Sequence, residues 1–371
     1  MELTKNKYKD SEVGMIPEDW NVLSIGDVTS ISVGRDLKEN NFSIFPDSNY
    51  KFPVFSNTVS NEGLYGYYDI SEYNGDSLTV VGRGVGLGTA FVRQGGYGAI
   101  GRLLILFPKK NIDTKYLTEY INNRVKIFSE SGGIPQLTGI SIAKYLIPIP
   151  KHKSEQTAIA NALSDTDALI ESLEKIIVKK RNIKQGAMQE LLKPKESWET
   201  TLIGRLAELY QPVTISQELF TNDGYLVYGA NGIIGRYNKY NHEHWQTTIT
   251  CRGSTCGTVN KTNDKCWITG NAMVVNVDNN PNIDKTFFYF LMSKQDFKNC
   301  ITGSGQPQIV RKPLAEFEVS IPREKTEQIR IASIFLDMDT EINYLGQKLQ
   351  KYKMIKQGMM QVLLTGKIRL L

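Results

Sequence analysis

An internal duplication constrains the fold of this chain more than any other feature of its sequence. When the 371 residues are shifted by 172 positions, residues 155–195 align with 327–367 without a gap, and 18 of the 41 aligned positions are identical. For example, KQGAMQELL at 184–192 matches KQGMMQVLL at 356–364. Two repeats this long do not stack as the short units of a solenoid do. The chain therefore consists of two units, each a variable region followed by a similar tail.

The variable regions share a looser correspondence. GRGVGLGT at 82–89 lies over CRGSTCGT at 251–258, and SGGIPQL at 131–137 lies over GSGQPQI at 303–309. Short apolar runs separated by Gly, Asn and Asp predict strands, and two further apolar segments predict short helices. The strands are predicted at 77–82, 103–107, 247–250 and 271–277, and the helices at 116–128 and 287–297. Each variable region is therefore expected to be a mixed sheet-and-helix globule.

Each tail is predicted to form one long amphipathic helix. Apolar residues recur in both tails at spacings of 3, 4 and 7, and the stripe extends through Ile183 to Leu191 and through Ile355 to Leu363. Ser154 and Thr326 are the expected helix starts, and Pro194 and Gly366 mark the expected ends. At 1.5 Å per residue, a helix of about 38 residues is about 57 Å long.

A helix that stands clear of a compact domain needs another like it to pack on, and the obvious partner is the other repeat. We expect an α+β fold in which an antiparallel coiled coil joins two mixed domains. The alternative is a pair of ordinary amphipathic helices, each lying on its own domain. The predicted domains are 1–150 and 196–322, and the predicted spacer helices are 151–195 and 323–371. The predicted core of the helix pair consists of Ile159, Leu163, Ile170, Leu173, Ile177, Ile331, Phe335, Ile342, Leu345 and Leu349.

Gly186 and Gly358 occupy matched positions inside the predicted helices. Glycine there costs up to about 1 kcal/mol relative to alanine. We interpret that cost as a sign of close packing, by a partner subunit or by the opposite domain. A flexible break in each helix is the alternative.

The composition permits a nucleic-acid partner but does not require one. The 44 Lys and Arg residues exceed the 39 Asp and Glu residues by only five. Apolar runs such as 103–107 and 287–292 are far shorter than the roughly 20 residues of a membrane-spanning helix. The first 14 residues also lack the apolar stretch of a secretory signal. We therefore expect a cytoplasmic protein with no membrane partner, in which the four cysteines stay reduced.

Two patterns that suggest cofactor or metal chemistry have the wrong spacing. GRGVGLG lacks the full GxGxxG spacing of a dinucleotide loop. Five zinc-competent residues lie close together in the sequence but lack paired CxxC spacing: His242, His244, Cys251, Cys256 and Cys266. No metal site and no bound cofactor are therefore expected on this chain.

The motifs of the duplicated set resemble those of the specificity subunit of type I restriction-modification systems. The resemblance rests on SEVGMIPEDW at 11–20, IPIPKHKSEQTAIA at 147–160, VSIPREKTEQIRIA at 319–332, the matched KQG endings and the terminal LLTGKIRL at 363–370. Each motif alone is weak, but the duplicated set is specific. The resemblance covers essentially the whole chain, including the order of variable region, helix, variable region and helix.

The resemblance implies a chain that reads DNA and performs no catalysis. Each variable region would be a target recognition domain for one half of a split DNA sequence. The paired helices would space the two domains and dock two modification subunits, which carry the adenine methyltransferase and its S-adenosylmethionine. A separate motor-nuclease subunit joins for restriction in this family. The resemblance does not carry over any specific bases.

The antiparallel helix pair predicts the form of the target. It places two similar domains at opposite ends of the helices, and sites one duplex turn apart are separated by about 34 Å. A target of two unlike short sequences with an unread gap follows, because the two variable regions differ.

Two other function classes remain open from the sequence. A self-contained DNA methyltransferase or nuclease would need a cofactor loop and a pocket for a flipped base. The Pro-Pro motif typical of adenine methyltransferases is missing, since no Pro-Pro pair occurs in the chain. A structural coiled-coil adaptor would explain the helices but not the two large variable domains.

Candidate DNA contacts follow from the side chains that recognise bases and phosphates. Arg83 and Arg252, at matched positions before a turn, are the best pair, although a bond to a local carboxylate is the alternative role. Gln136 and Gln308 lie in the matched Gly-Pro loops and either face DNA or stabilise the loop. Weaker candidates are Arg102, Lys239, Lys261 and Asn271.

Overall fold

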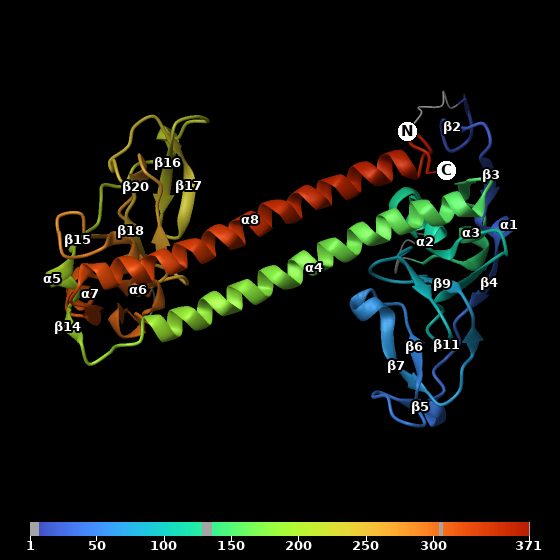
Figure 1. The fold of residues 1–371 in the computed structure, drawn as a ribbon, viewed down its shortest axis with the longest axis horizontal. Helices are drawn as coiled ribbons and strands as arrows, with labels where there is room; N and C mark the ends of the chain where they lie inside the picture. The colour runs from blue at the N-terminus through green and yellow to red at the C-terminus, as the bar shows by residue number, and fades with distance from the viewer. Residues whose placement is uncertain (1–6, 128–135, 304–306, 371) are drawn as a thin grey trace. The chain divides into compact units, whose positions relative to one another are not determined.

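The computed structural model of the chain describes residues 7–127, 136–303 and 307–370. It divides into two compact units. Unit 1 comprises residues 1–174 and 348–371, and unit 2 comprises residues 175–347. The two long helices, α4 and α8, each contribute one part to each unit (Figure 1).

Unit 1 is built on a four-stranded antiparallel sheet in the order β10-β9-β12-β4. A five-stranded sheet, β5-β7-β6-β11-β8, and the pairs β13-β3 and β1-β2 complete it. Its strands are β1 Tyr8–Lys9, β2 Ile16–Pro17, β3 Asn21–Ser24, β4 Thr29–Val33, β5 Phe42–Ser43, β6 Phe52–Phe55, β7 Leu64–Tyr68, β8 Tyr73–Asn74, β9 Ser77–Val80, β10 Ala90–Arg93, β11 Gly96–Ala99, β12 Leu104–Pro108 and β13 Leu146–Ile149. Its short helices are α1 Ile25–Val28, α2 Thr114–Arg124 and α3 Gly139–Ala143, with 3-10 turns η1 Glu39–Asn41 and η2 Ser60–Gly63.

Unit 2 repeats this plan, with the four-stranded sheet in the matching order β19-β18-β21-β15. The smaller sheet has only three strands, β17-β16-β20, and the pairs are β14-β24 and β22-β23. Its strands are β14 Trp198–Leu202, β15 Glu208–Tyr210, β16 Tyr225–Gly229, β17 Gly232–Tyr237, β18 Thr247–Thr250, β19 Val259–Lys261, β20 Trp267–Ile268, β21 Ala272–Asn276, β22 Ile301–Thr302, β23 Gln308–Ile309 and β24 Glu318–Pro322. Its short helices are α5 Ile203–Leu206, α6 Lys285–Lys294 and α7 Arg311–Ala315, with η3 Gln217–Leu219 and η4 Lys298–Cys300.

The long helices match their sequence prediction in number and length. Each spans 39 residues, α4 over Lys153–Leu191 and α8 over Lys325–Leu363, or about 58 Å. The predicted starts were wrong by one residue, because Ser154 and Thr326 lie inside the first turn. No helix in the described part of the chain is both long and apolar enough to cross a membrane.

The helices pair antiparallel within unit 1. Glu174 binds Lys353 at 2.7 Å, and Asp167 binds Lys356 at 2.6 Å. From the first ion pair to the second, the residue number falls on α4 and rises on α8, so the two helices run antiparallel. Both ion pairs are partly exposed, so they fix the register more than they stabilise the fold.

The helix segments of unit 2 pair in the same sense. Lys180 binds Glu341 at 2.8 Å, and further along α4, Lys184 binds Asp339. The antiparallel pairing predicted from the duplication is therefore found separately in each unit.

The predicted core of the helix pair is only partly correct. Leu173 and Ile177 are buried, and Ile170, Ile342, Leu345 and Leu349 are half-buried. The other four residues lie in the domain cores, Ile159 and Leu163 in unit 1 and Ile331 and Phe335 in unit 2. The reason is that the first turns of each helix cover a domain, so their apolar face is buried against the domain as well as the other helix.

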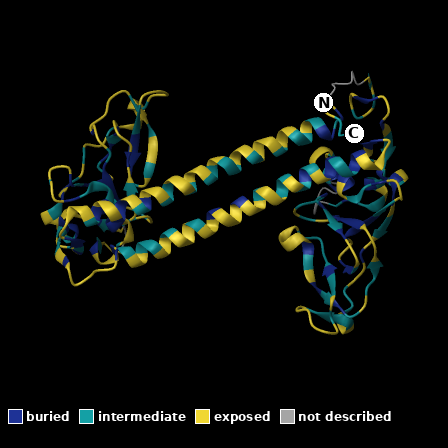
Figure 2. Cartoon of the chain, viewed as in Figure 1, coloured by how far each residue is buried: buried dark blue, intermediate teal, exposed yellow. Residues whose placement is uncertain are grey.

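The expected extension of the apolar stripe is only partly correct, because Leu363 is buried and Leu191 is half-buried, whereas the positions before them are exposed. Ile183 is 45% exposed and Ile355 is 41% exposed. In Figure 2, exposed residues run along much of α4 and α8. Helical periodicity therefore located the apolar face but overestimated how much of it the other helix covers.

A buried glutamine fixes the start of each long helix to its domain. Nε2 of Gln156 donates to the carbonyls of Pro150 at 3.0 Å and Asn111 at 3.2 Å, and its Oε1 accepts from Asp113 N at 2.8 Å. Gln328 makes the same three bonds in unit 2, with the lengths 3.0, 3.2 and 2.8 Å. The Glu-Gln pair repeated in the sequence is thus a structural element that orients each helix.

Replacing Gln328 by leucine is expected to destabilise unit 2 by about 3 kcal/mol or more, because three backbone groups lose their buried partner at about 1–3 kcal/mol each. Chemical denaturation of the chain would measure the change in the free energy of unfolding. Gln347→Leu, at an exposed position of α8, serves as the control. Equal effects from the two variants would contradict the assigned role of Gln328.

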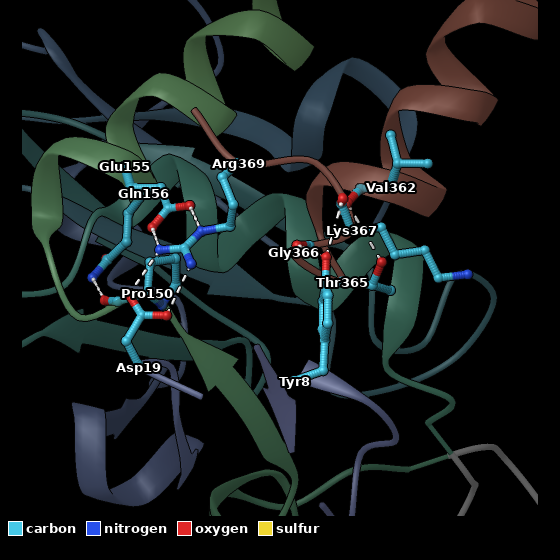
Figure 3. A network of polar contacts seen from close by, with 10 residues as sticks. All are labelled: Tyr8, Asp19, Pro150, Glu155, Gln156, Val362, Thr365, Gly366, Lys367 and Arg369. Atoms are coloured by element: carbon cyan, nitrogen blue, oxygen red, sulfur yellow. Dashed lines mark hydrogen bonds and ion pairs between the residues drawn. The ribbon is translucent and has the colours of Figure 1, made fainter. Parts of the chain in front are cut away.

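The C-terminal tail closes unit 1 through one arginine (Figure 3). The Arg369 guanidinium donates to Glu155 Oε2 at 2.7 Å and to both Asp19 oxygens at 2.9 and 2.8 Å. It also lies 5.7 Å from the centre of the Trp20 ring. In unit 2 the matching glutamate, Glu327, binds Lys195, which lies shortly after the end of α4. The residues after α8 in unit 1 therefore play the part that the residues after α4 play in unit 2.

Replacing Arg369 by alanine is expected to cost about 3–5 kcal/mol, because it leaves Glu155, only 1% exposed, as an unpaired buried carboxylate. The hydrogen bond from Arg369 also lowers the pKa of Asp19 below its usual 3.8 in the folded state. Asp19 thus stabilises the fold above pH 3.8 and loses that effect as the pH falls through its lower folded pKa.

Unfolding of Arg369→Ala at neutral pH and below pH 4 tests both effects. The variant should lose stability at neutral pH and show a smaller further loss in acid than the parent chain. The exposed neighbour provides the control as Lys367→Ala. An acid profile parallel to that of the parent would rule out the role of Asp19.

Candidate nucleic-acid interface

A tight turn in each four-stranded sheet carries one of the predicted arginines. Arg83 lies in the turn between β9 and β10, where Gly88 N donates to Val81 O at 2.8 Å. Arg252 lies in the turn between β18 and β19, where Gly257 N donates to Thr250 O at 2.9 Å. The two turns share this hydrogen bond, and both arginines are exposed.

A backbone bridge brings the predicted glutamines to these turns. Arg83 pairs with Gln136, and Arg252 pairs with Gln308. A bond of 2.8 Å from Leu137 N to Gly82 O secures the first bridge. In unit 2 the corresponding bond, from Ile309 N to Cys251 O, is 2.9 Å long. Each unit therefore places one Arg and one Gln from distant segments side by side.

The paired arginines have no carboxylate partner among the residues that the structure describes. Within the described residues, no hydrogen bond or ion pair engages the guanidinium of Arg83 or Arg252, so neither is held by a local carboxylate.

A third segment joins the arginine turn in unit 1. Asn57 accepts a hydrogen bond from Gly82 N at 2.8 Å and donates one to Gly101 O. These two glycines directly precede Arg83 and Arg102. A Cβ on Gly82 would lie 2.9 Å from the carbonyl oxygen of Arg102, so only glycine permits this approach.

Arg35 belongs to the same place, although the sequence did not identify it. Its N–H donates to Ala99 O at 3.0 Å, and its carbonyl accepts from Gly101 N at 3.0 Å. Arg35 is exposed and follows Gly34, whose Cβ would lie 2.9 Å from the Ala99 backbone. The recurring Gly-Arg pair at the end of a strand is the signal that would have found it. We define the unit 1 site as Arg35, Arg83, Arg102 and Gln136.

The unit 2 site has the same framework but fewer charges. Cys251 N donates to Asn271 O at 3.2 Å, which brings Asn271 beside the Arg252 turn. In unit 2, Pro212 occupies the place that Arg35 occupies in unit 1. Its carbonyl oxygen would lie 2.7 Å from a Cβ added to Gly270. We define the unit 2 site as Arg252, Asn271 and Gln308.

The two lysine candidates lie outside this site. Lys261 pairs with Thr247, at the end of the β18–β19 hairpin away from Arg252. Its ammonium lies 4.2 Å from the centre of the Trp245 ring, and burial lowers its pKa. Lys239 is exposed but follows the end of β17 that pairs with Tyr225, away from the turn. The structure therefore does not bring either lysine to the paired Arg and Gln.

The zinc-competent residues are used in other ways. Nε2 of His242 lies 2.9 Å from the Tyr210 hydroxyl, and Nδ1 lies 2.6 Å from Oδ1 of Asn241. Burial raises the pKa of the Cys251 and Cys266 thiols and lowers that of His242. No cluster of three metal-binding side chains occurs among the described residues.

The two helix glycines have no packing partner within the described chain. A Cβ on Gly186 or on Gly358 would meet no atom within 4 Å. Packing by the opposite domain was therefore the wrong interpretation of these glycines. Two interpretations of these glycines remain, namely packing by a partner subunit and a flexible break in each helix.

The comparison with known families decides the relationship. A family model described as the type I restriction modification DNA specificity domain matches residues 17–179 and again 195–353. The chain belongs to this specificity family. The resemblance found in the sequence is confirmed, and the double match reproduces the duplication.

Relatives of the specificity family match along the whole chain. The MjaVIII specificity subunit of Methanocaldococcus jannaschii is 23% identical, and the match covers 98% of this chain and 96% of the relative. The MjaX specificity subunit of the same organism, described as putative, is 24% identical over 98% of this chain and 97% of its own length.

Solved structures show the same fold. The S subunit of a type I restriction-modification system from M. genitalium matches with a TM-score of 0.69 and 18% identity, over 98% of both chains. A chain from a structure of type I system assembly matches with a TM-score of 0.53 and 11% identity, over 95% of this chain and 99% of that one.

Proposed function

We propose that this chain is the DNA specificity subunit of a type I restriction-modification complex, and that each unit reads one half of a two-part duplex target. The observation that carries the proposal is the repetition of the Arg-Gln site. The same turn presents an exposed arginine and a bridged glutamine once in unit 1 and once in unit 2. Two such readers need two half-targets.

The side chains at the two sites fit direct base recognition in the major groove. Arginine binds the O6 and N7 acceptors of guanine through two parallel bonds, and Asn or Gln binds adenine in the same way. The remaining backbone N–H groups of the turns suit phosphate contacts, which position a reader without selecting a sequence.

The long helices are proposed to set the spacing of the half-targets and to dock two modification subunits. A length of about 58 Å exceeds the 34–36 Å of one duplex turn, so the pair is long enough to hold two readers one turn apart. The proposed docking positions are Gly186 and Gly358. Both are exposed, and a Cβ added to either would meet no described atom within 4 Å.

Catalysis is proposed to belong to the partners. The modification subunits would bind S-adenosylmethionine and methylate adenine, and a motor-nuclease subunit would cleave DNA. We place the complex in the cytoplasm because its ligand is duplex DNA. A self-contained methyltransferase is the competing proposal, and it requires a cofactor site on this chain.

Incubation with labelled S-adenosylmethionine and duplex DNA tests this division of labour. The chain alone should transfer no label, and the chain with its modification subunit should label adenine in a defined target. Methylation by the lone chain would overturn the proposal. Failure of this chain to change which DNA the modification subunit methylates would overturn it as well.

A further inference from the structure

The positions of Arg102 and Asn271 are structurally equivalent. Each follows a glycine, and each leads into the strand at the centre of its four-stranded sheet, β12 or β21. Each backbone also meets the residue before the paired arginine. The contact is with Gly82 in unit 1 and with Cys251 in unit 2.

Both side chains are exposed beside a reading turn. In the described part of the chain, no hydrogen bond or ion pair engages the guanidinium of Arg102 or the side-chain amide of Asn271. Contacts within residues 7–127, 136–303 and 307–370 therefore do not account for either side chain.

The backbone of Arg102 supports a functional role for its side chain. Its φ is +66°, in the left-handed region that favours glycine and asparagine. An arginine persists there although smaller residues fit with less strain. Strained backbone of this kind concentrates at functional sites.

We infer that this shared position is a specificity determinant, at which Arg102 reads a guanine in one half-target and Asn271 reads an adenine in the other. The inference rests on the proposed function. Arg83 and Arg252 are the same residue in both units, so they do not distinguish the half-targets. At the position of Arg102 and Asn271, in contrast, the side chain differs between the units. Arginine has only donors and suits the two acceptors of guanine, whereas asparagine has a donor and an acceptor and suits adenine.

Selection from a duplex library tests the assignment. The complex of this chain with its modification subunit would be used, and the base preference at every position of the recovered targets would be compared with that of the variants. Arg102→Asn should change one preferred base from guanine to adenine in one half-target, by about tenfold or more. Asn271→Arg should cause the reverse change in the other half-target.

Arg102→Lys separates base reading from phosphate binding. Lysine keeps the charge but loses the two parallel bonds, so discrimination at the guanine should fall while the salt dependence of binding stays the same. Because asparagine tolerates a positive φ, Arg102→Asn is expected to keep the fold.

Three outcomes would overturn the inference. The first is an unchanged base preference in Arg102→Asn with parental affinity. The second is a uniform loss of affinity for all sequences with a weaker salt dependence, which is typical of a phosphate contact. In the third, the parent complex selects no two-part target. The third outcome overturns the proposed function itself, whereas the first two leave it intact.

Discussion

Replacing Arg252 by alanine is expected to weaken specific DNA binding by the assembled complex about tenfold or more, because a bidentate Arg-guanine contact contributes about 1–3 kcal/mol of discrimination. Arg252 is the one arginine among the described residues that define the unit 2 site, so this site has no second guanidinium to replace it. Titration of a labelled target duplex at fixed salt would measure the change. The preference for the base that Arg252 reads should relax at the same time.

Two matched variants make the result specific. Lys239→Ala removes an exposed cation from the same unit but outside the site, and it should leave the base preference unchanged. Arg83→Ala should reduce affinity less than Arg252→Ala, because Arg35 and Arg102 remain at the unit 1 site. If Arg252→Ala and Lys239→Ala had the same effect, the arginine turn would not be a base-reading element.

Lengthening both long helices by one turn is expected to widen the unread gap of the target or to abolish specific binding. Four residues inserted after Lys175 and four after Gln347 add about 6 Å to each helix, less than two base-pair steps of about 3.4 Å. The same insertion rotates one unit about the helix pair, so the two sites no longer face the duplex as before. Selection of targets from a duplex library would read the gap directly.

A control insertion distinguishes spacing from general damage. Four residues inserted in the exposed loop after Pro46 should leave the gap unchanged, because the loop follows β5, which lies well away from the unit 1 segments of α4 and α8 (Figure 1). An unchanged gap in the lengthened protein, with binding retained, would rule out the helices as the element that sets the spacing.

The helices could be predicted from the sequence because their signal is local and occurs twice. The repeated 3.6-residue pattern gave two helices of about 38 residues, and the structure has 39 in each. The pattern did not reveal what covers each part of the apolar face. Of the residues that the pattern assigned to the helix pair, Ile159 and Phe335 lie in domain cores and Ile183 is exposed.

The duplication matched Arg83 with Arg252 and Gln136 with Gln308, but it did not predict the backbone bridge that joins each arginine to a glutamine. Arg35 and Asn57 escaped prediction because separate strands bring them to the turn, and no local spacing encodes that crossing. Residue type alone misplaced Lys261, whose ammonium packs on an aromatic ring. Pairing within the sheet, and not proximity in sequence, decides which side chains meet.

The most direct test of the account is a map of methylated adenines in a host that expresses this chain with its modification partner. The account predicts methylation at a two-part target, with two unlike short sequences separated by a fixed gap. It also predicts that variants of the unit 1 site change only one half of that target. Methylation at a single continuous sequence, or a pattern unaffected by substitutions in this chain, would contradict it.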